Sequence, residues 1–499
     1  MAPRVCIWVT ACWLTAMPAG AAEPWEGAET VAAKIDELTA QHWQSAGVQP
    51  AGPADDATYY RRLMLDVAGR VPTRREAQSF VQDAAAGKRS AAALRLVSGP
   101  EFPLHFANVL DDMLQGRYAG DREFLAYLRD GLKARATWDQ TFREIVLGPW
   151  ETPERKRADR FLQRRVKSTD ELTNDVSRIF FGVDISCAKC HDHPLVDDWK
   201  QDHFYGLSSF FNRSYEFRGE QNLIGEKDEG EIEFVTREGE NRKAKLMFLS
   251  GQVLEEPSLA DDPQRKAALE QAKKDKKYLP PRYSRREQLV QAALEDRRLF
   301  SRAMVNRVWA YLLGRGLVQP VDQMHSANPA AIPPLLDWLA EDFAASGYHL
   351  ERLIAGIVMS RPYQLSSDWP EGANRPAPEL FSVAPLRPLS PKQYAVSLLL
   401  VTGDESFDDL PDDAARAERH KQLDDRANGL ARDLDVRTDE FQSSVGESLF
   451  MSNHPTVQQL LKPAGKNLAA RLLAASDDEQ LIELADWSIF SRPPAGDEP

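Results

Sequence analysis

The sequence is short of cysteine, of excess positive charge and of long hydrophobic runs. Only four of its 499 residues are cysteine, and Cys6 and Cys12 fall within an N-terminal leader pattern. The mature chain would therefore keep Cys187 and Cys190 alone. The net charge of −14 argues against a nucleic-acid partner, because neutralising phosphates requires a basic surface. No apolar run is long enough to cross a bilayer, so we expect no integral membrane span in the mature chain.

Common catalytic motifs are also missing. The chain has no Gly-x-Ser-x-Gly elbow, no glycine-rich phosphate loop and no His-Glu-x-x-His pair. These absences exclude the hydrolase and nucleotide-binding classes that such motifs define. We therefore assign no catalytic residue and leave open whether the chain is an enzyme or a redox protein without catalytic turnover of its own.

Residues 1–22 have the three parts of a secretory signal peptide. Arg4 supplies the positive charge, residues 5–17 form the apolar stretch, and small residues at 19–22 precede Glu23. The apolar stretch is too short to be a permanent anchor. We expect an exported protein, either periplasmic or located outside the cell or at its surface.

Helical periodicity dominates the rest of the chain. Apolar residues recur every three or four positions through both halves, which is typical of amphipathic helices that pack on a core. The predicted fold class is mainly α, with two helical domains joined by a small β-hairpin and linker segment. We expect a cytochrome c-like helical domain at 23–213, the hairpin and a charged linker at 214–281, and a C-terminal helical domain at 282–499.

Local signals predict several boundaries within these domains. Asp56 is placed to cap a helix that ends at Gly69. Alternating residues at 231–236 and the run at 245–249 predict the two strands of the hairpin, and the charged segment 260–277 predicts a solvated helix or linker. Four serine- or threonine-led motifs predict helix starts. They are Thr73-x-x-Glu76, Ser168-x-x-Glu171, Ser284-x-x-Glu287 and Ser390-Pro391-x-Gln393.

The run Cys187-Ala188-Lys189-Cys190-His191 is the strongest functional signal in the sequence. A C-x-x-C-H motif in an exported chain is typical of covalent attachment of haem c. Thiols at i and i+3 can bond to the two haem vinyl groups, while the next histidine binds the iron. We therefore predict Cys187 and Cys190 as thioether anchors and His191 as the proximal ligand.

A second metal ligand would have to reach the opposite face of the iron. His193 is excluded, because two residues of chain span at most roughly 7 Å, which is too short for two histidines on one iron. His203 is far enough along the chain to reach. We therefore predict His203 as a candidate second metal ligand.

Two other chemistries fit the same residues. Cys187, Cys190, His193 and His203 would supply a tetrahedral Cys₂His₂ set for zinc, although the spacing of the histidines is longer than usual. In an oxidising compartment the two cysteines could also close a disulfide or act as a redox pair. Zinc and a disulfide therefore stand as alternatives to haem.

Two groups of segments and a C-terminal signature resemble those of a known family. They are 55–58, 61–62, 65–66, 69, 72–73 and 187–211 in the first half, 303–309, 314–318, 320–322, 328–329, 335–339 and 360–367 in the second, and Ser491-Arg492-Pro493-Pro494 at the end. Over most of its length the chain thus resembles the planctomycete-type secreted cytochrome c-like proteins, which join two domains of unknown function, DUF 1549 followed by DUF 1553. The resemblance implies an exported, mainly helical protein assigned to haem c binding and electron transfer, and a partner such as another exported protein.

These observations support one leading hypothesis and one alternative. The first is an exported monohaem redox protein that passes electrons to a redox partner protein, with residues 282–499 as a helical docking or substrate module. The alternative is a structural or interaction protein without redox activity, in which the Cys/His motif binds zinc or forms a disulfide.

Overall fold

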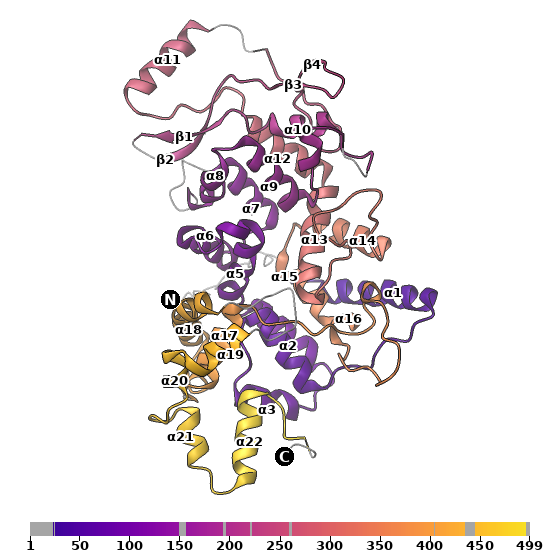
Figure 1. Ribbon diagram of the computed structural model, residues 1–499, viewed down its shortest axis with the longest axis vertical. Helices are drawn as coiled ribbons and strands as arrows, with labels where there is room; N and C mark the ends of the chain where they lie inside the picture. The colour runs from indigo at the N-terminus through magenta and orange to yellow at the C-terminus, as the bar shows by residue number, and fades with distance from the viewer. Residues whose placement is uncertain are drawn as a thin grey trace, which may run out of the picture.

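The computed structural model describes residues 23, 25–148, 156–192, 196–219, 222–258, 262–403, 405–434 and 445–495. The expected signal peptide at 1–22, with Cys6 and Cys12, and also His193 lie outside these residues. The described chain is mainly α-helical, as predicted, with two small antiparallel sheets of two strands each (Figure 1). Within these ranges, no helix combines the length and apolar character needed to cross a membrane.

The helices fall into two groups, before and after the strands. The first group is α1 (Ala28–Ala46), α2 (Asp56–Ala68), α3 (Arg74–Gln82), α4 (Lys88–Ser98), α5 (Glu101–Gln115), α6 (Arg122–Lys133), α7 (Trp138–Leu147), α8 (Arg160–Arg165), α9 (Thr169–Phe181) and α10 (Gln201–Ser208), with the short 3₁₀ turn η3 (Ser186–Lys189) between the last two. The second group is α11 (Pro263–Lys274), α12 (Arg285–Asp296), α13 (Arg298–Leu313), α14 (Pro333–Ala345), α15 (Leu350–Met359), α16 (Arg361–Gln364), α17 (Pro391–Val401), α18 (Asp413–Asp433), α19 (Val445–Asn453), α20 (Pro455–Leu460), α21 (Leu468–Leu473) and α22 (Asp478–Ile489).

Helices from the two groups pack on each other within one hydrophobic core. The N-terminal helix α1 lies against α15, and α9 lies against α13 (Figure 1). The same core runs from Ala28 to Phe381 and includes the wholly buried Trp309. A smaller core is built mainly by α17 and α18, and Val71 from the first half joins it. The two halves of the sequence therefore stabilise each other.

Capping residues set the helix starts much as the sequence predicts. Thr73 and Glu76 form a complete capping box, as do Ser390 and Gln393. Ser168 accepts the backbone N–H of the residue three positions on, and Ser284 does the same. One cap was predicted wrongly. The side chain that caps α2 is Asp55, because it accepts the N–H of Thr58, whereas Asp56 already belongs to the helix.

The hairpin region contains two hairpins instead of one. Strand β1 (Ser214–Arg218) pairs with β2 (Asn222–Glu226), and β3 (Glu233–Val235) pairs with β4 (Asn241–Lys243). The predicted strand at 245–249 was wrong. Its apolar side chains enter the main core, where the ring of Phe248 meets that of Phe181 edge to face at 5.2 Å. The charged segment that follows forms α11, which has no buried residue, as expected of a solvated helix.

Helix α9 ends at Gly182, just before the C-x-x-C-H motif. Gly182 has φ +68°, in the left-handed region that favours glycine. Its carbonyl accepts the N–H of Met324 at 3.0 Å, and a Cβ at this position would lie 2.9 Å from the Met324 sulfur. The absence of a side chain thus lets the segment around Met324 pack directly on the end of α9.

Replacing Gly182 by alanine is expected to destabilise the protein by about 2–4 kcal/mol. About 1–2 kcal/mol comes from the left-handed backbone, and the rest comes from the contact with Met324. Gly47→Ala is a matched control, because Gly47 has φ +64° and nothing lies within 4 Å of its Cβ position. Urea denaturation measures both. Equal losses would mean that Met324 moves aside at no cost.

Candidate functional site

The C-x-x-C-H motif begins on the turn η3, between α9 and α10. Asp184 starts the turn, because its Oδ1 accepts the backbone N–H of Ser186 at 2.9 Å and the Ser186 hydroxyl at 2.6 Å. The N–H of Cys190 then donates to the carbonyl of Cys187 at 3.3 Å. An aspartate followed two residues later by serine is a turn signal that the sequence already carries.

One face of this turn is buried and the other carries the thiols. Ala188 is wholly buried in the main core. The Lys189 ammonium pairs with Asp170, and its carbonyl accepts the side-chain amide of Gln201 at 3.4 Å. Both Cys187 and Cys190 are exposed and free. The turn is thus held from inside while its two sulfur atoms face solvent.

His191 is oriented by the backbone of the next residue. Its Nδ1 lies 2.6 Å from the carbonyl oxygen of Asp192. A carbonyl can only accept a hydrogen bond, so Nδ1 carries a proton, and in the neutral ring Nε2 then keeps the lone pair. Asp192 is held in turn, since its Oδ1 accepts the N–H of Gln201 at 3.1 Å. This is the tautomer and the supporting hydrogen bond that a histidine needs to bind a metal through Nε2.

His203 is oriented in the opposite way. Its Nδ1 accepts the N–H of Lys200 at 3.1 Å, and its ring meets that of Trp199 edge to face at 5.7 Å. Burial lowers the pKa of His203, and Lys200 lowers it further, while Asp202 opposes the shift. The ring is therefore neutral at pH 7, with its proton on Nε2. Ligation by His203 requires this hydrogen bond to break, and it stays a prediction.

The zinc alternative requires at least three ligating side chains around one point. In the described part of the chain, no three histidine, cysteine, aspartate or glutamate side chains lie close enough together to hold a metal ion. Cys187, Cys190 and His203 therefore do not form such a group. The fourth residue of the predicted set, His193, is outside the described residues.

Aromatic residues after the motif are core residues. The side chains of Phe204, Phe210 and Phe211 are buried in the main core. Tyr205 is half-buried and stacks on Phe234 of β3, with ring centroids 4.1 Å apart. The three phenylalanines therefore contribute to the packing of the domain that carries the motif.

The second half of the sequence supports the helix that leads into the motif. Arg307 of α13 donates to the carbonyls of Arg178 and Ile179 at 2.7 and 3.2 Å, near the end of α9. Burial lowers the pKa of Arg307 to about 10, although Asp322 opposes the shift. The sequence predicts no such role for Arg307, because local patterns do not reveal contacts between residues this far apart.

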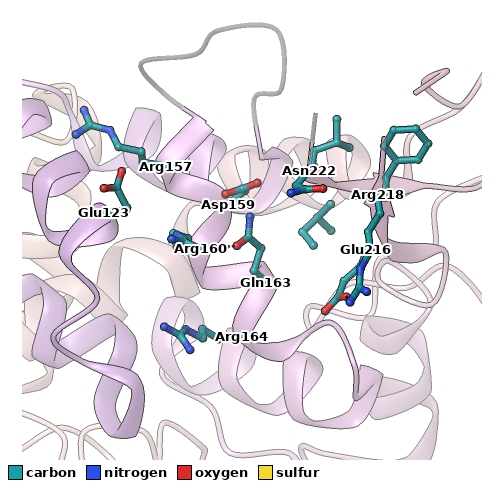
Figure 2. Close-up of a pocket in the computed structure, with 12 residues that line it drawn as sticks. Glu123, Arg157, Asp159, Arg160, Gln163, Arg164, Glu216, Arg218 and Asn222 are labelled. Carbon is teal, nitrogen blue, oxygen red and sulfur yellow. Dashed lines mark hydrogen bonds and ion pairs between the residues drawn. The ribbon is translucent and has the colours of Figure 1, made fainter. Parts of the chain in front are cut away.

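A cleft of about 880 Å³ lies between α8 and the β1–β2 hairpin, and none of its lining residues belongs to the motif. Figure 2 shows Arg157, Arg160 and Arg164 on its helical side and Glu216 and Arg218 on its strand side. These arginines already have acidic partners. The pairs are Arg157 with Asp130 at 2.7 Å, Arg160 with Asp121 at 3.7 Å, Arg164 with Asp121 at 2.8 Å and Arg218 with Glu216 at 2.9 Å.

Two segments of the chain match known families, and both families are described as proteins of unknown function. Residues 34–216 match PSCyt2 (DUF1549), and residues 285–437 match PSD1 (DUF1553). The first segment contains Cys187, Cys190, His191 and His203. No curated protein and no solved structure matches the chain.

Proposed function

Since the chain belongs to the proteins that join a DUF1549 domain to a DUF1553 domain, we propose that it is an exported c-type redox protein. One haem would be held by thioether bonds to Cys187 and Cys190 and by the Nε2 atom of His191. When bound, this group supplies one-electron transfer at a potential that the protein sets. The pair of families agrees with the resemblance seen in the sequence, and their descriptions assign no activity.

One observation carries the proposal. Two free, exposed thiols at i and i+3 stand beside a histidine whose Nδ1 proton is donated to the carbonyl of Asp192. That donation leaves Nε2 as a ligand and fixes the plane of the ring. The donor set therefore fits haem c in residue type, spacing and protonation.

Other residues of the site have supporting roles. Asp184 fixes the start of the turn, and Gln201 links the turn to α10. Arg307 and Met324 hold the end of α9 from the other half of the chain. Residues 282–499 would be a helical docking or substrate module, and their helices share a core with the domain that carries the motif.

Expression in a host that exports proteins and attaches haem tests this function. We expect the purified protein to show a Soret band and to keep its haem on a denaturing gel, because thioether bonds survive unfolding. A colourless protein with one zinc ion per chain would support the structural alternative. A colourless protein with a Cys187–Cys190 disulfide or two free thiols would also contradict the proposal.

A further inference from the structure

A second cleft brings together segments that are far apart in the sequence. Its volume is about 670 Å³, and it is lined by Ser367 and by parts of 58–66, 310–314, 385–393 and 490–492. These parts come from α2, from the end of α13, from the loop into α17 and from the residues at and after the end of α22. The cleft is separate from the C-x-x-C-H motif, whose neighbour α10 is well removed from α2 in Figure 1. Segments that resemble both domains and the C-terminal signature thus meet at one place.

The charged side chains that line this cleft are four arginines and one aspartate: Arg61, Arg62, Arg387, Arg492 and Asp66. The aspartate is already satisfied. Both of its oxygens accept from Arg387, at 2.8 and 2.7 Å, and the hydroxyl of Tyr363 donates to it at 2.8 Å. With Arg387 paired to Asp66, the positive charge that concerns us in this cleft is that of Arg61 and Arg62, in a chain whose net charge is −14.

Two of these arginines bond only to neutral groups. Nη1 of Arg61 donates to the carbonyl of Ile489 at 2.8 Å and to the hydroxyl of Ser491 at 2.9 Å. Nη1 of Arg62 donates to the carbonyl of Leu365 at 3.0 Å and to that of Tyr363. Within the described residues neither arginine has a carboxylate within ion-pair distance, and Nε and Nη2 of both have no hydrogen-bond acceptor. Burial lowers the pKa of each, because it removes the cation from water; no charged group opposes this for Arg61, whereas Tyr363 and Asp66 oppose it for Arg62.

The arginines in the cleft of Figure 2 differ from Arg61 and Arg62, because they are paired with carboxylates. They carry a similar formal charge, but each one is neutralised by an aspartate or glutamate of the chain itself. In the second cleft Arg61 and Arg62 line the cavity, and Nε and Nη2 of each have no hydrogen-bond acceptor among the described residues. Placing uncompensated charge in a half-buried cleft costs folding free energy, and a bound anion offsets that cost.

We propose that this cleft binds a small organic anion, with Arg61 and Arg62 as its direct ligands. The planar fork of donors on each guanidinium matches the paired oxygens of a carboxylate or a phosphate. Leu65, Leu389 and Phe490 supply an apolar wall for the body of the ligand. The volume is within the range of pockets that enclose small molecules. The ligand class is thus a carboxylated or phosphorylated compound of modest size.

Titration of the full-length protein with two probes at constant ionic strength tests this site. Citrate represents the carboxylates and glucose 6-phosphate the phosphate esters. We expect at least one of them to raise Tm in a saturable way and to release or absorb heat in calorimetry. Saturation by only one of the two identifies the anionic group that the site prefers. The absence of saturable binding of either up to about 10 mM, tenfold above a Kd of 1 mM, would overturn the proposal.

Substitutions locate the binding. Arg61→Gln is expected to weaken the affinity at least about tenfold, because it removes a charge-assisted pair, and Arg61→Lys to give an intermediate loss, because it keeps the charge without the fork. Arg164→Gln, in the cleft of Figure 2, should leave the affinity unchanged. Arg62 also holds two carbonyls, so Arg61 is the first choice for a folded variant. Equal affinity in Arg61→Gln and the unaltered protein would refute the assignment, whether or not the protein carries haem.

Discussion

When it is produced in a host that attaches haem, the double variant Cys187→Ser, Cys190→Ser is expected to carry no haem that survives denaturation. Both sulfur atoms are exposed on a turn that is held by its buried face, so their loss removes the bonds to the cofactor without opening the core. Serine keeps the size and polarity of the side chain but forms no thioether. Haem staining of a denaturing gel, normalised to protein, measures the effect.

Four further variants test this result more finely. Each single variant, Cys187→Ser or Cys190→Ser, retains one thioether and should keep part of the stain. Ser186→Ala changes the same turn without touching a sulfur atom and should keep all of it, because Asp184 still accepts the backbone N–H. His191→Gln should alter the visible spectrum of whatever haem remains attached. An unchanged stain in the double variant would refute covalent attachment at this motif.

Replacing Arg70 by methionine is expected to cost about 3–5 kcal/mol of unfolding free energy at pH 7. Arg70 is wholly buried and pairs with two carboxylates, Glu76 at 2.7 and 2.9 Å and Glu101 at 3.0 Å. The ring of Phe407 covers its guanidinium, with the carbon 4.5 Å from the ring centroid. Methionine fills much of the volume but removes the cation that pairs with both carboxylates, which leaves Glu76 with Arg416 at 3.3 Å and Glu101 with His420 at 3.4 Å. Removing one partner of a buried ion pair has a cost of this size.

The unfolding free energy lost in Arg70→Met should decrease as the pH falls. Burial opposes ionisation of Glu76 and Glu101, but Arg70, with His420 beside it at Glu101, outweighs burial and lowers the pKa of both below the ordinary 4.5. A group whose pKa is lower in the folded state contributes stability above its unfolded pKa and loses that contribution as the pH falls toward the folded value. The difference in unfolding free energy between Arg70→Met and the unaltered protein should therefore be largest at pH 7 and should decrease as acid protonates the two glutamates.

Urea denaturation at pH 7 and pH 4 checks this prediction, since urea does not screen charge. Arg75→Met is the matched control, because Arg75 pairs with Asp409 on the surface, where both side chains are at least half exposed. An exposed pair of this kind contributes at most about 1 kcal/mol. A loss for Arg70→Met that does not exceed that of the control, or that is equal at both pH values, would contradict the role assigned to Arg70.

Local signals predicted the helical elements well. Ser168 and Ser284 accept the N–H groups that their motifs specify, and Gly182 ends α9 where the periodicity stops. The predictions of the caps were correct because a cap is an interaction between residues three positions apart. The strand predicted at 245–249 failed for the opposite reason. An apolar run of four residues, 246–249, fits either a strand or a buried segment, and Leu246, Phe248 and Leu249 are packed in the main core.

The candidate site was also predicted only in part from the sequence. The spacing of Cys187, Cys190 and His191 is visible in the sequence, and so is the chemistry that such a spacing favours. The protonation of His191 is not, because it depends on how the chain turns at Asp192. Nor is the hydrogen bond from Arg307 to the end of α9, which joins residues more than a hundred positions apart.

The amino-acid order by itself determined the mainly helical class, most helix ends and the C-x-x-C-H motif, since each rests on contacts within a few residues of chain. Only the tertiary structure decided that α1 and α15 share a core, that Arg70 meets Glu101, and that Arg61 and Arg387 line one cleft. Those contacts join segments distant in sequence, and packing of the whole chain selects them where local periodicity carries no information about partners.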